Sequence, residues 1–157
     1  MFKSRRGEVS VDLNAEETDL LRNLIADYEQ LLDADHDAND PVRRRLFPDA
    51  SLDDHEANEK FIELTRDSLD EHKRETIKIA IGSLGPQGEW QGWVSEDERD
   101  AWLCLLADLR LAIGVRIGVT DEMMERDADP RDPQQWPLAV LHYLGALQGS
   151  LVDAVMR

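Results

Sequence analysis

The chain has 157 residues, of which 41% are hydrophobic and 33% charged, and its formal net charge is −16. This length suits one domain that buries about 70% of the surface of the unfolded chain, so we expect a single helical domain over residues 1–157. The negative charge disfavours autonomous binding to DNA, RNA or anionic lipid, because phosphate groups are repelled, and it favours a basic protein partner.

The first predicted elements are a strand and a capped helix. Residues 8–13 alternate apolar and polar side chains, the pattern of a half-buried strand, and residues 2–6 could form its hairpin partner across Gly7. Asn14, with Glu17 completing a capping box, begins a helix that reaches about residue 34 and places its leucines on one face.

A polar stretch and an irregular segment follow. We expect residues 33–41 to form an acidic loop. The spacing of its acidic residues resembles that of a calcium-binding loop, but it lacks the glycine and the bidentate glutamate that an EF-hand needs. Residues 43–50 are predicted to be irregular, with Leu46 and Phe47 packed against the bundle.

A long helix is predicted from residue 53 or 54 to about 82, before the break at 85–88. Residues 90–94 could form another strand, and Ser95 begins a second capping box. Because this strand–cap–helix order repeats that of residues 8–34, the two strands could pair into a small sheet beside the bundle.

The segment 101–113 is the most informative stretch of the chain. Its thirteen residues carry only two charges, and apolar side chains lie on every side of the helix. A helix that is apolar all round is buried, so we expect a central helix at about 101–117. A short helix at 120–126 and a last helix at about 134–155 complete a mainly α bundle, with a small sheet from residues 2–13 and 90–94.

Composition also indicates the cellular compartment. Cys104 is the single cysteine, which excludes an internal disulfide or a cysteine-built zinc site. The N-terminus lacks the apolar core of a signal peptide, and no apolar run approaches the roughly 20 residues that cross a bilayer. We therefore expect a soluble cytoplasmic protein.

The motifs show no catalytic or cofactor-binding arrangement. His55 and Glu59 lie one helical turn apart and could supply two metal ligands, but a zinc site needs a third, and an exposed helix face is the favoured interpretation. His72, on the apolar side of its helix, is interpreted as a hydrogen-bonded core residue. The sequence therefore predicts no enzyme activity, no metal and no cofactor.

Other polar residues receive structural interpretations. Cys104 is expected to be buried and inert. Arg110, inside the apolar helix, should pair with a carboxylate, with Glu63 or Asp67 as candidates, since an unpaired buried charge costs several kcal/mol. The cluster Arg43–Arg45 is expected to pair with nearby acidic residues.

Three segments carry a family likeness: Arg45-Leu-Phe-Pro-Asp-Ala50, the stretch from Trp102 to Val119, and Leu144 to Val152. They resemble an actinobacterial family, long catalogued as a domain of unknown function and now named for the oxidative-stress transcriptional regulator AosR. The likeness spans nearly the whole chain. Its charged and aromatic residues are candidates for structural or partner-contact roles: Arg45, Phe47, Asp49, Trp102, Asp108, Arg110 and Arg116.

The resemblance implies a cytoplasmic regulator of the oxidative-stress response that acts through protein–protein contact with RNA polymerase or a sigma factor. With one cysteine, any redox response of Cys104 would need a mixed or intersubunit disulfide or a sulfenic acid. The alternatives are a quality-control adaptor of a protease or chaperone and, less favoured, a metal-dependent enzyme at His55 and Glu59. A homodimer is left open, and no membrane partner is expected.

Overall fold

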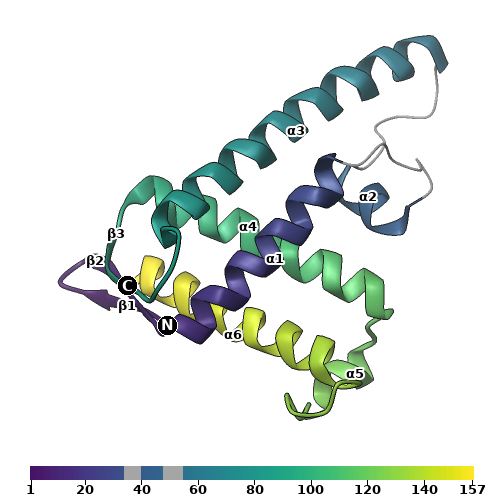
Figure 1. The fold of residues 1–157 in the computed structure, drawn as a ribbon. Helices are drawn as coiled ribbons and strands as arrows, with labels where there is room; N and C mark the ends of the chain where they lie inside the picture. The colour runs from purple at the N-terminus through teal and green to yellow at the C-terminus, as the bar shows by residue number, and fades with distance from the viewer. Residues whose placement is uncertain (34–39, 48–54) are drawn as a thin grey trace.

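The computed structural model describes residues 1–33, 40–47 and 55–157, and the side chains of these residues except at 55–63, 65 and 66. The fold is mainly helical with one small antiparallel sheet, which confirms the predicted fold class. Its elements, drawn in Figure 1, are β1 (Phe2–Arg5), β2 (Glu8–Leu13), α1 (Ala15–Asp33), α2 (Pro41–Leu46), α3 (His55–Leu84), β3 (Trp90–Val94), α4 (Glu96–Ile117), α5 (Asp121–Glu125) and α6 (Trp136–Met156).

The three strands pair in the order β1-β2-β3, and both pairs are antiparallel. Arg6 and Gly7 both have positive φ, 55° and 83°, as a tight hairpin turn with right-handed strand twist requires. Val9 of β2 lies opposite Val94 of β3, and both are buried. The predicted hairpin and the predicted pairing of the two short strands are confirmed.

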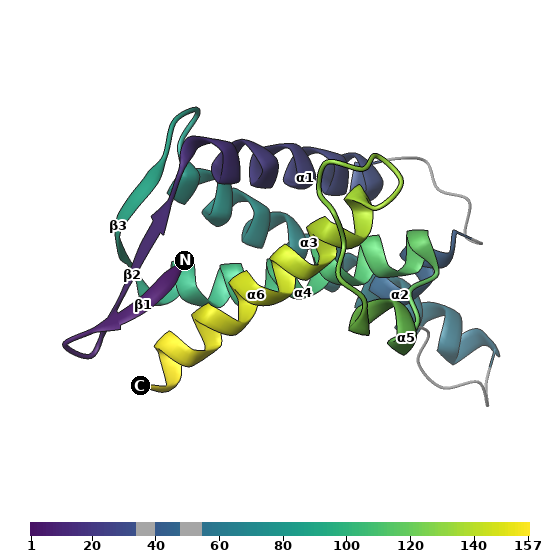
Figure 2. The same ribbon diagram turned by 90° about the horizontal axis from the view of Figure 1, so that it is seen from below.

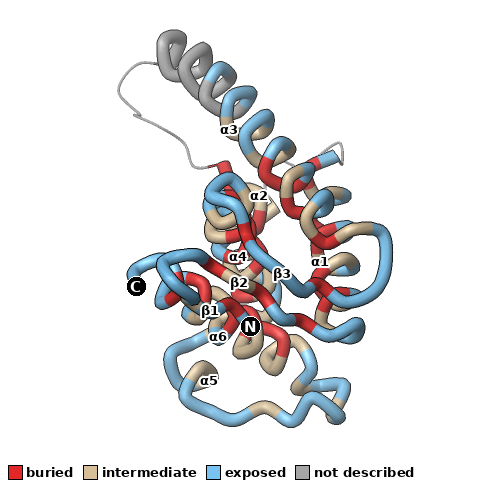
Figure 3. Tube along the Cα trace, turned by 90° about the vertical axis from the view of Figure 1, so that its left-hand side faces the viewer, coloured by how far each residue is buried: buried red, intermediate tan, exposed pale blue. Residues whose placement is uncertain are grey.

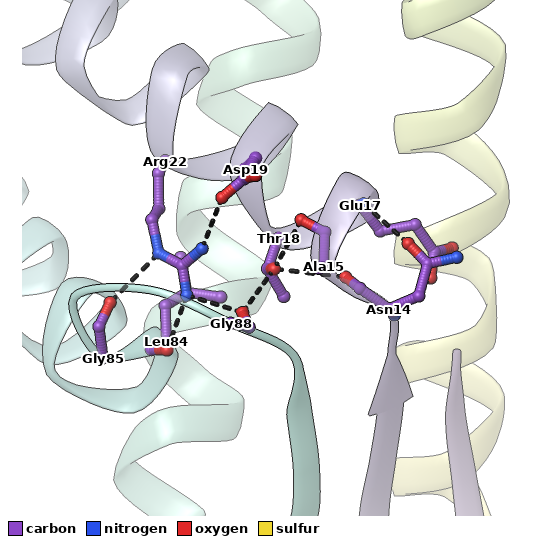
Figure 4. A network of polar contacts seen from close by, with 9 residues as sticks. All are labelled: Asn14, Ala15, Glu17, Thr18, Asp19, Arg22, Leu84, Gly85 and Gly88. Atoms are coloured by element: carbon purple, nitrogen blue, oxygen red, sulfur yellow. Dashed lines mark hydrogen bonds and ion pairs between the residues drawn. The ribbon is translucent and has the colours of Figure 1, made fainter.

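A capping box begins α1, as predicted. The backbone N–H of Asn14 donates to Glu17 Oε2, and that of Glu17 donates to Asn14 Oδ1, each over 2.9 Å. Thr18 Oγ1 donates to the carbonyl of Gly88 over 2.7 Å, and the Arg22 guanidinium donates to three carbonyls at the end of α3 and in the loop after it. Figure 4 shows how these contacts fasten the start of α1 to the loop that joins α3 to β3.

Helix α4 lies at the centre of the bundle, where it contacts α1, α2, α3 and α6. Figure 2 shows α6 crossing over it. Trp102, Leu105 and Leu106 are buried, but Cys104 and Ala107 are exposed. The central position is confirmed, and one strip of the helix nevertheless faces water. Cys104 and Ala107 count as apolar on a helical wheel, but their side chains are small. Covering them with another element would remove little apolar area from water and would stabilise the fold little.

The side chain of Trp102 connects α4 to α3 and to the sheet. It is 0% exposed, and its Nε1–H donates to Ser83 Oγ over 2.8 Å. Its ring centroid lies 5.3 Å from that of Trp90, whose ring packs nearly perpendicular to that of Phe2. One indole thus packs α4 against α3 and anchors the sheet beside the bundle.

Helix α6 packs against α4 and against β1. By length and composition alone it could cross a membrane, although we expected no apolar segment of that length from the sequence. A core helix has the same composition, and one side of α6 contributes six buried residues: Val140, Leu141, Leu144, Leu147, Leu151 and Ala154. Packing of these residues in the core therefore explains part of the apolar composition of α6.

Residues 41–46 form the short helix α2, where an irregular segment was predicted. Asp40 is its N-cap and accepts hydrogen bonds from two backbone N–H groups of the first turn, and Pro41 follows the cap. Both are helix-start signals. Leu46 and Phe47 are buried, as predicted. The acidic loop predicted at 33–41 lies largely outside the described residues.

The other helices begin and end within a few residues of the predictions. Ser95 and Glu98 form the predicted second capping box at the start of α4. Buried residues, red in Figure 3, line the faces where the helices and the sheet meet, and the loop after α5 is mostly exposed.

Candidate functional site

Asp108 on α4 joins three helices through two short hydrogen bonds. The hydroxyl of Tyr28 on α1 donates to Oδ2 over 2.6 Å, and Lys73 Nζ on α3 lies 2.7 Å from the same oxygen. The Lys73 and Asp108 side chains are only 12% and 23% exposed. Burial, and then the hydrogen bond to Asp108, raise the pKa of Tyr28 well above its ordinary value, so its hydroxyl stays protonated. We call Tyr28, Lys73 and Asp108 the Asp108 cluster.

Cys104 lies next to the Asp108 cluster and is exposed. With His72 and the cluster it lines a cavity of about 270 Å³ between α1, α3 and α4. The prediction of a buried Cys104 is therefore wrong. The prediction of a core position for His72 is also wrong, because His72 is exposed.

Arg110 connects α4 to α6 rather than to α3. Its Nη1 donates to Gln148 Oε1 over 2.7 Å, and its Nε is buried without a hydrogen-bond partner. The guanidinium lies against Gly145, where an added Cβ would come within 3.6 Å. Arg110 pairs with a side chain of another helix, but the partner is a neutral amide and not the predicted carboxylate. Asp67 is exposed, and the side chain of Glu63 lies outside the described part.

Cationic side chains fasten the two ends of α2, its C-terminal end to α3 through Lys73 and its N-terminal cap to α4 through Arg116. The guanidinium carbon of Arg43 lies 4.9 Å from the Phe47 ring centroid, and Lys73 Nζ lies 5.9 Å from it, so Arg43 pairs with an aromatic ring where an acidic partner was expected. Arg116 Nη2 lies 2.9 Å from Asp40 Oδ2, which ties the C-terminal part of α4 to the cap of α2.

Other predicted residues do not join these clusters. Trp102 belongs to the core, and Arg45 is exposed. Asp49 and the side chains of His55 and Glu59 lie outside the described residues. Among the residues that are described, no group of three or more His, Cys, Asp or Glu side chains could hold a metal ion.

A larger feature is a groove between the first turns of α1, helix α5 with the loop after it, and the first half of α6. Its volume is about 770 Å³. Apolar side chains contributed by α1, α5, the loop and α6 form much of its lining: Leu20, Met124, Ala128, Pro130, Trp136, Ala139 and Val140. We call it the α1–α6 groove.

Two hydrogen bonds hold the walls of the α1–α6 groove together. The hydroxyl of Tyr143 on α6 donates to Glu17 Oε1 on α1 over 3.2 Å, and His142 Nε2 lies 2.9 Å from the carbonyl oxygen of Arg126. Burial, followed by the charge of Glu17, raises the pKa of Tyr143 above its ordinary value. Three further carboxylates line the groove: Glu16, Glu125 and Asp127.

The family model that describes a domain of unknown function, DUF2017, matches residues 1–155. The chain belongs to the DUF2017 family. The Asp108 cluster and the α1–α6 groove both lie inside the matched residues of this DUF2017 chain. No curated protein and no solved structure matches it.

Sequence reasoning missed the α1–α6 groove of this DUF2017 chain because its walls come from segments more than a hundred residues apart. One local signal was available. Trp136 begins a helix directly after a polar, proline-containing turn, and aromatic side chains are enriched in protein interfaces.

Proposed function

We propose that the protein is a regulator that acts by protein–protein contact, with RNA polymerase or a sigma factor as its partner and oxidative stress as its signal. The observation that carries this proposal is the α1–α6 groove, an apolar depression with carboxylates in its lining on a chain of net charge −16. An apolar centre with a polar rim is the usual composition of a protein interface.

The surface charge supports a protein partner over a nucleic acid. Acidic residues outnumber basic ones by 34 to 18, and several of the arginines are engaged inside the fold, such as Arg22 with backbone carbonyls and Arg110 with Gln148. A duplex needs cations on its phosphates. A basic surface of a polymerase subunit or sigma factor would instead be attracted and steered toward this chain.

The exposed thiol of Cys104 supports a response to oxidants. Accessibility is required for oxidation to a sulfenic acid or a mixed disulfide, and Cys104 is accessible. It lies on α4 and lines a cavity together with the Asp108 cluster, so a modification there would change the surroundings of that cluster. We place this function in the cytoplasm, where RNA polymerase and its sigma factors work.

Binding measurements with purified components test the proposal. The immobilised chain is exposed to RNA polymerase core enzyme, to holoenzyme and to separate sigma factors of the source organism, with dithiothreitol or after hydrogen peroxide. We expect saturable binding to one of them, weakened by salt, and a change on peroxide treatment that Cys104→Ser abolishes. Absence of binding under both conditions contradicts the proposal, and binding to a protease or chaperone component instead indicates the quality-control alternative.

A further inference from the structure

We propose that the α1–α6 groove binds a basic segment of the partner protein, with a large apolar side chain of that segment seated against Trp136 and its Lys or Arg side chains on the groove's carboxylates. This inference rests on the proposed function, since it names the part of the surface that makes the contact and the chemistry of the segment that it accepts.

The apolar part of the groove is available for contact. Trp136 keeps 44% of its surface exposed, although a tryptophan is among the largest apolar side chains. Leu20 and Ala139, both partly exposed, lie in the same lining. Tryptophan is one of the residue types enriched among the residues that dominate the binding energy of an interface, and the volume of about 770 Å³ accommodates one large side chain and its neighbours.

The charges around the groove select a basic occupant. Glu16, Glu125 and Asp127 line it and make no ion pair within the described part of the chain. Arg126, the basic residue of the lining, is held by Glu122, with Nη2 and Oε1 2.5 Å apart. The groove therefore presents unneutralised negative charge, which attracts lysine and arginine and repels phosphate.

The walls of the groove are set before any ligand binds. Glu17 has both carboxylate oxygens engaged, one by Tyr143 and one by the backbone of Asn14, so it holds α6 against α1 rather than serving a ligand. Thr120 caps α5 by accepting from the N–H of Met123 over 3.2 Å. A preformed groove spares the binding segment part of the ordering cost.

Titration with a synthetic peptide tests the inference directly. The probe is acetyl-Lys-Arg-Lys-Phe-Leu-Lys-Arg-Lys-amide, and the readout is the amide and indole spectrum of ¹⁵N-labelled protein, with the Trp136 indole assigned by Trp136→Phe. We expect saturable shifts of residues 16–20, 124–130 and 136–143. A peptide with Ala-Ala in place of Phe-Leu, and one with Gln in place of Lys and Arg, should each bind about tenfold more weakly.

Matched variants separate the groove from the overall negative charge. Ala139→Phe fills the groove and should weaken peptide binding at least about tenfold, while Ala146→Phe, at an exposed position of the same helix, should leave it unchanged. Circular dichroism of both variants establishes that they fold. If Ala139→Phe does not fold, Leu20→Lys, which adds a positive charge to the lining, replaces it.

A charge-matched comparison completes the set. The triple variant Glu16→Gln, Glu125→Gln and Asp127→Asn should lose most of the binding. A control with the same net charge, Asp27→Asn, Glu71→Gln and Glu75→Gln, changes exposed residues of α1 and α3 and should keep it. Equal losses in the two triple variants, shifts outside the groove, or equal binding of the Ala-Ala peptide would overturn the inference.

The same variants distinguish this inference from the proposed function. Polymerase or sigma-factor binding that survives Ala139→Phe overturns the groove as the contact surface and leaves the regulatory function standing. Peptide binding confined to the groove, without any binding of polymerase or sigma factor, supports the groove and contradicts the named partners.

Discussion

Tyr28 and Asp108 are eighty residues apart in the chain, yet the Tyr28 hydroxyl lies 2.6 Å from Asp108 Oδ2. Lys73 binds the same carboxylate oxygen, so a single side chain of α4 holds both α1 and α3. Asp108 thus joins α4 to its neighbours by hydrogen bonds, as Trp102 joins α4 to α3 and the sheet mainly by apolar packing. Cys104 lines a cavity together with the Asp108 cluster.

Removal of this carboxylate should destabilise the fold. Asp108→Ala leaves a mostly buried ammonium and a buried hydroxyl without their acceptor, which we expect to lower the free energy of unfolding by about 2–4 kcal/mol. Urea denaturation measures the change. Asp27→Ala, on the exposed side of α1, is the control and should change it by less than about 0.5 kcal/mol. Similar values for the two variants would show that the cluster does not fasten the helices.

Both tyrosines should resist ionisation in the folded protein. Tyr28 and Tyr143 are the two tyrosines of the chain, and burial together with a carboxylate acceptor raises the pKa of each. Because the folded protein favours the neutral phenol, each protonated tyrosine stabilises the fold. This contribution is complete below the unfolded-state pKa of about 10 and is lost as pH rises from there through the higher folded-state pKa. The phenolate absorbance should stay flat through pH 10 and rise only with alkaline unfolding. A smooth titration near pH 10 while the helical signal persists would contradict the placement of both hydroxyls.

Cys104 should react as an accessible thiol. Its side chain is exposed, so a thiol reagent such as Ellman's reagent should modify one equivalent in the native protein at a rate close to that of the unfolded chain. Cys104→Ser serves as the blank. If modification requires denaturant, Cys104 is buried, as the sequence predicted, and the exposed position is wrong.

The hydrogen bond between Trp102 and Ser83 should be measurable by a double-mutant cycle. Ser83→Ala leaves the buried indole N–H without its acceptor and should cost about 1–3 kcal/mol, and Trp102→Phe should cost a similar amount through lost contacts. The double variant should lose less than the sum, since both single changes break one bond. Trp93→Phe, on the exposed side of β3, is the neutral control. Strict additivity would mean that the bond contributes nothing to stability.

The sequence predicts the helices and strands of this fold better than it predicts which side chains each of them packs against. Periodicity and capping residues gave the strands and most helices, because these signals act between near neighbours. The short helix α2 was missed although Asp40 and Pro41 form a recognisable helix start. Its six residues are too few for a periodic pattern to develop.

The errors at Cys104, His72 and Arg110 have a different cause. A helical wheel shows which side chains are apolar, but not which neighbouring helix covers which side. Helix α4 turns Arg110 toward Gln148 of α6 and leaves Cys104 beside an open cavity. The α1–α6 groove depends on the same information, since it exists only after α1, α5 and α6 are brought together.

Hydrogen–deuterium exchange of the chain bound to RNA polymerase or to its sigma factor tests whether recognition occurs through the α1–α6 groove. We expect exchange to slow on binding in residues 15–20, 121–130 and 136–143. This protection should be lost in Ala139→Phe and kept in Ala146→Phe. A stable complex that leaves these three segments unprotected and slows exchange elsewhere would contradict recognition through the groove.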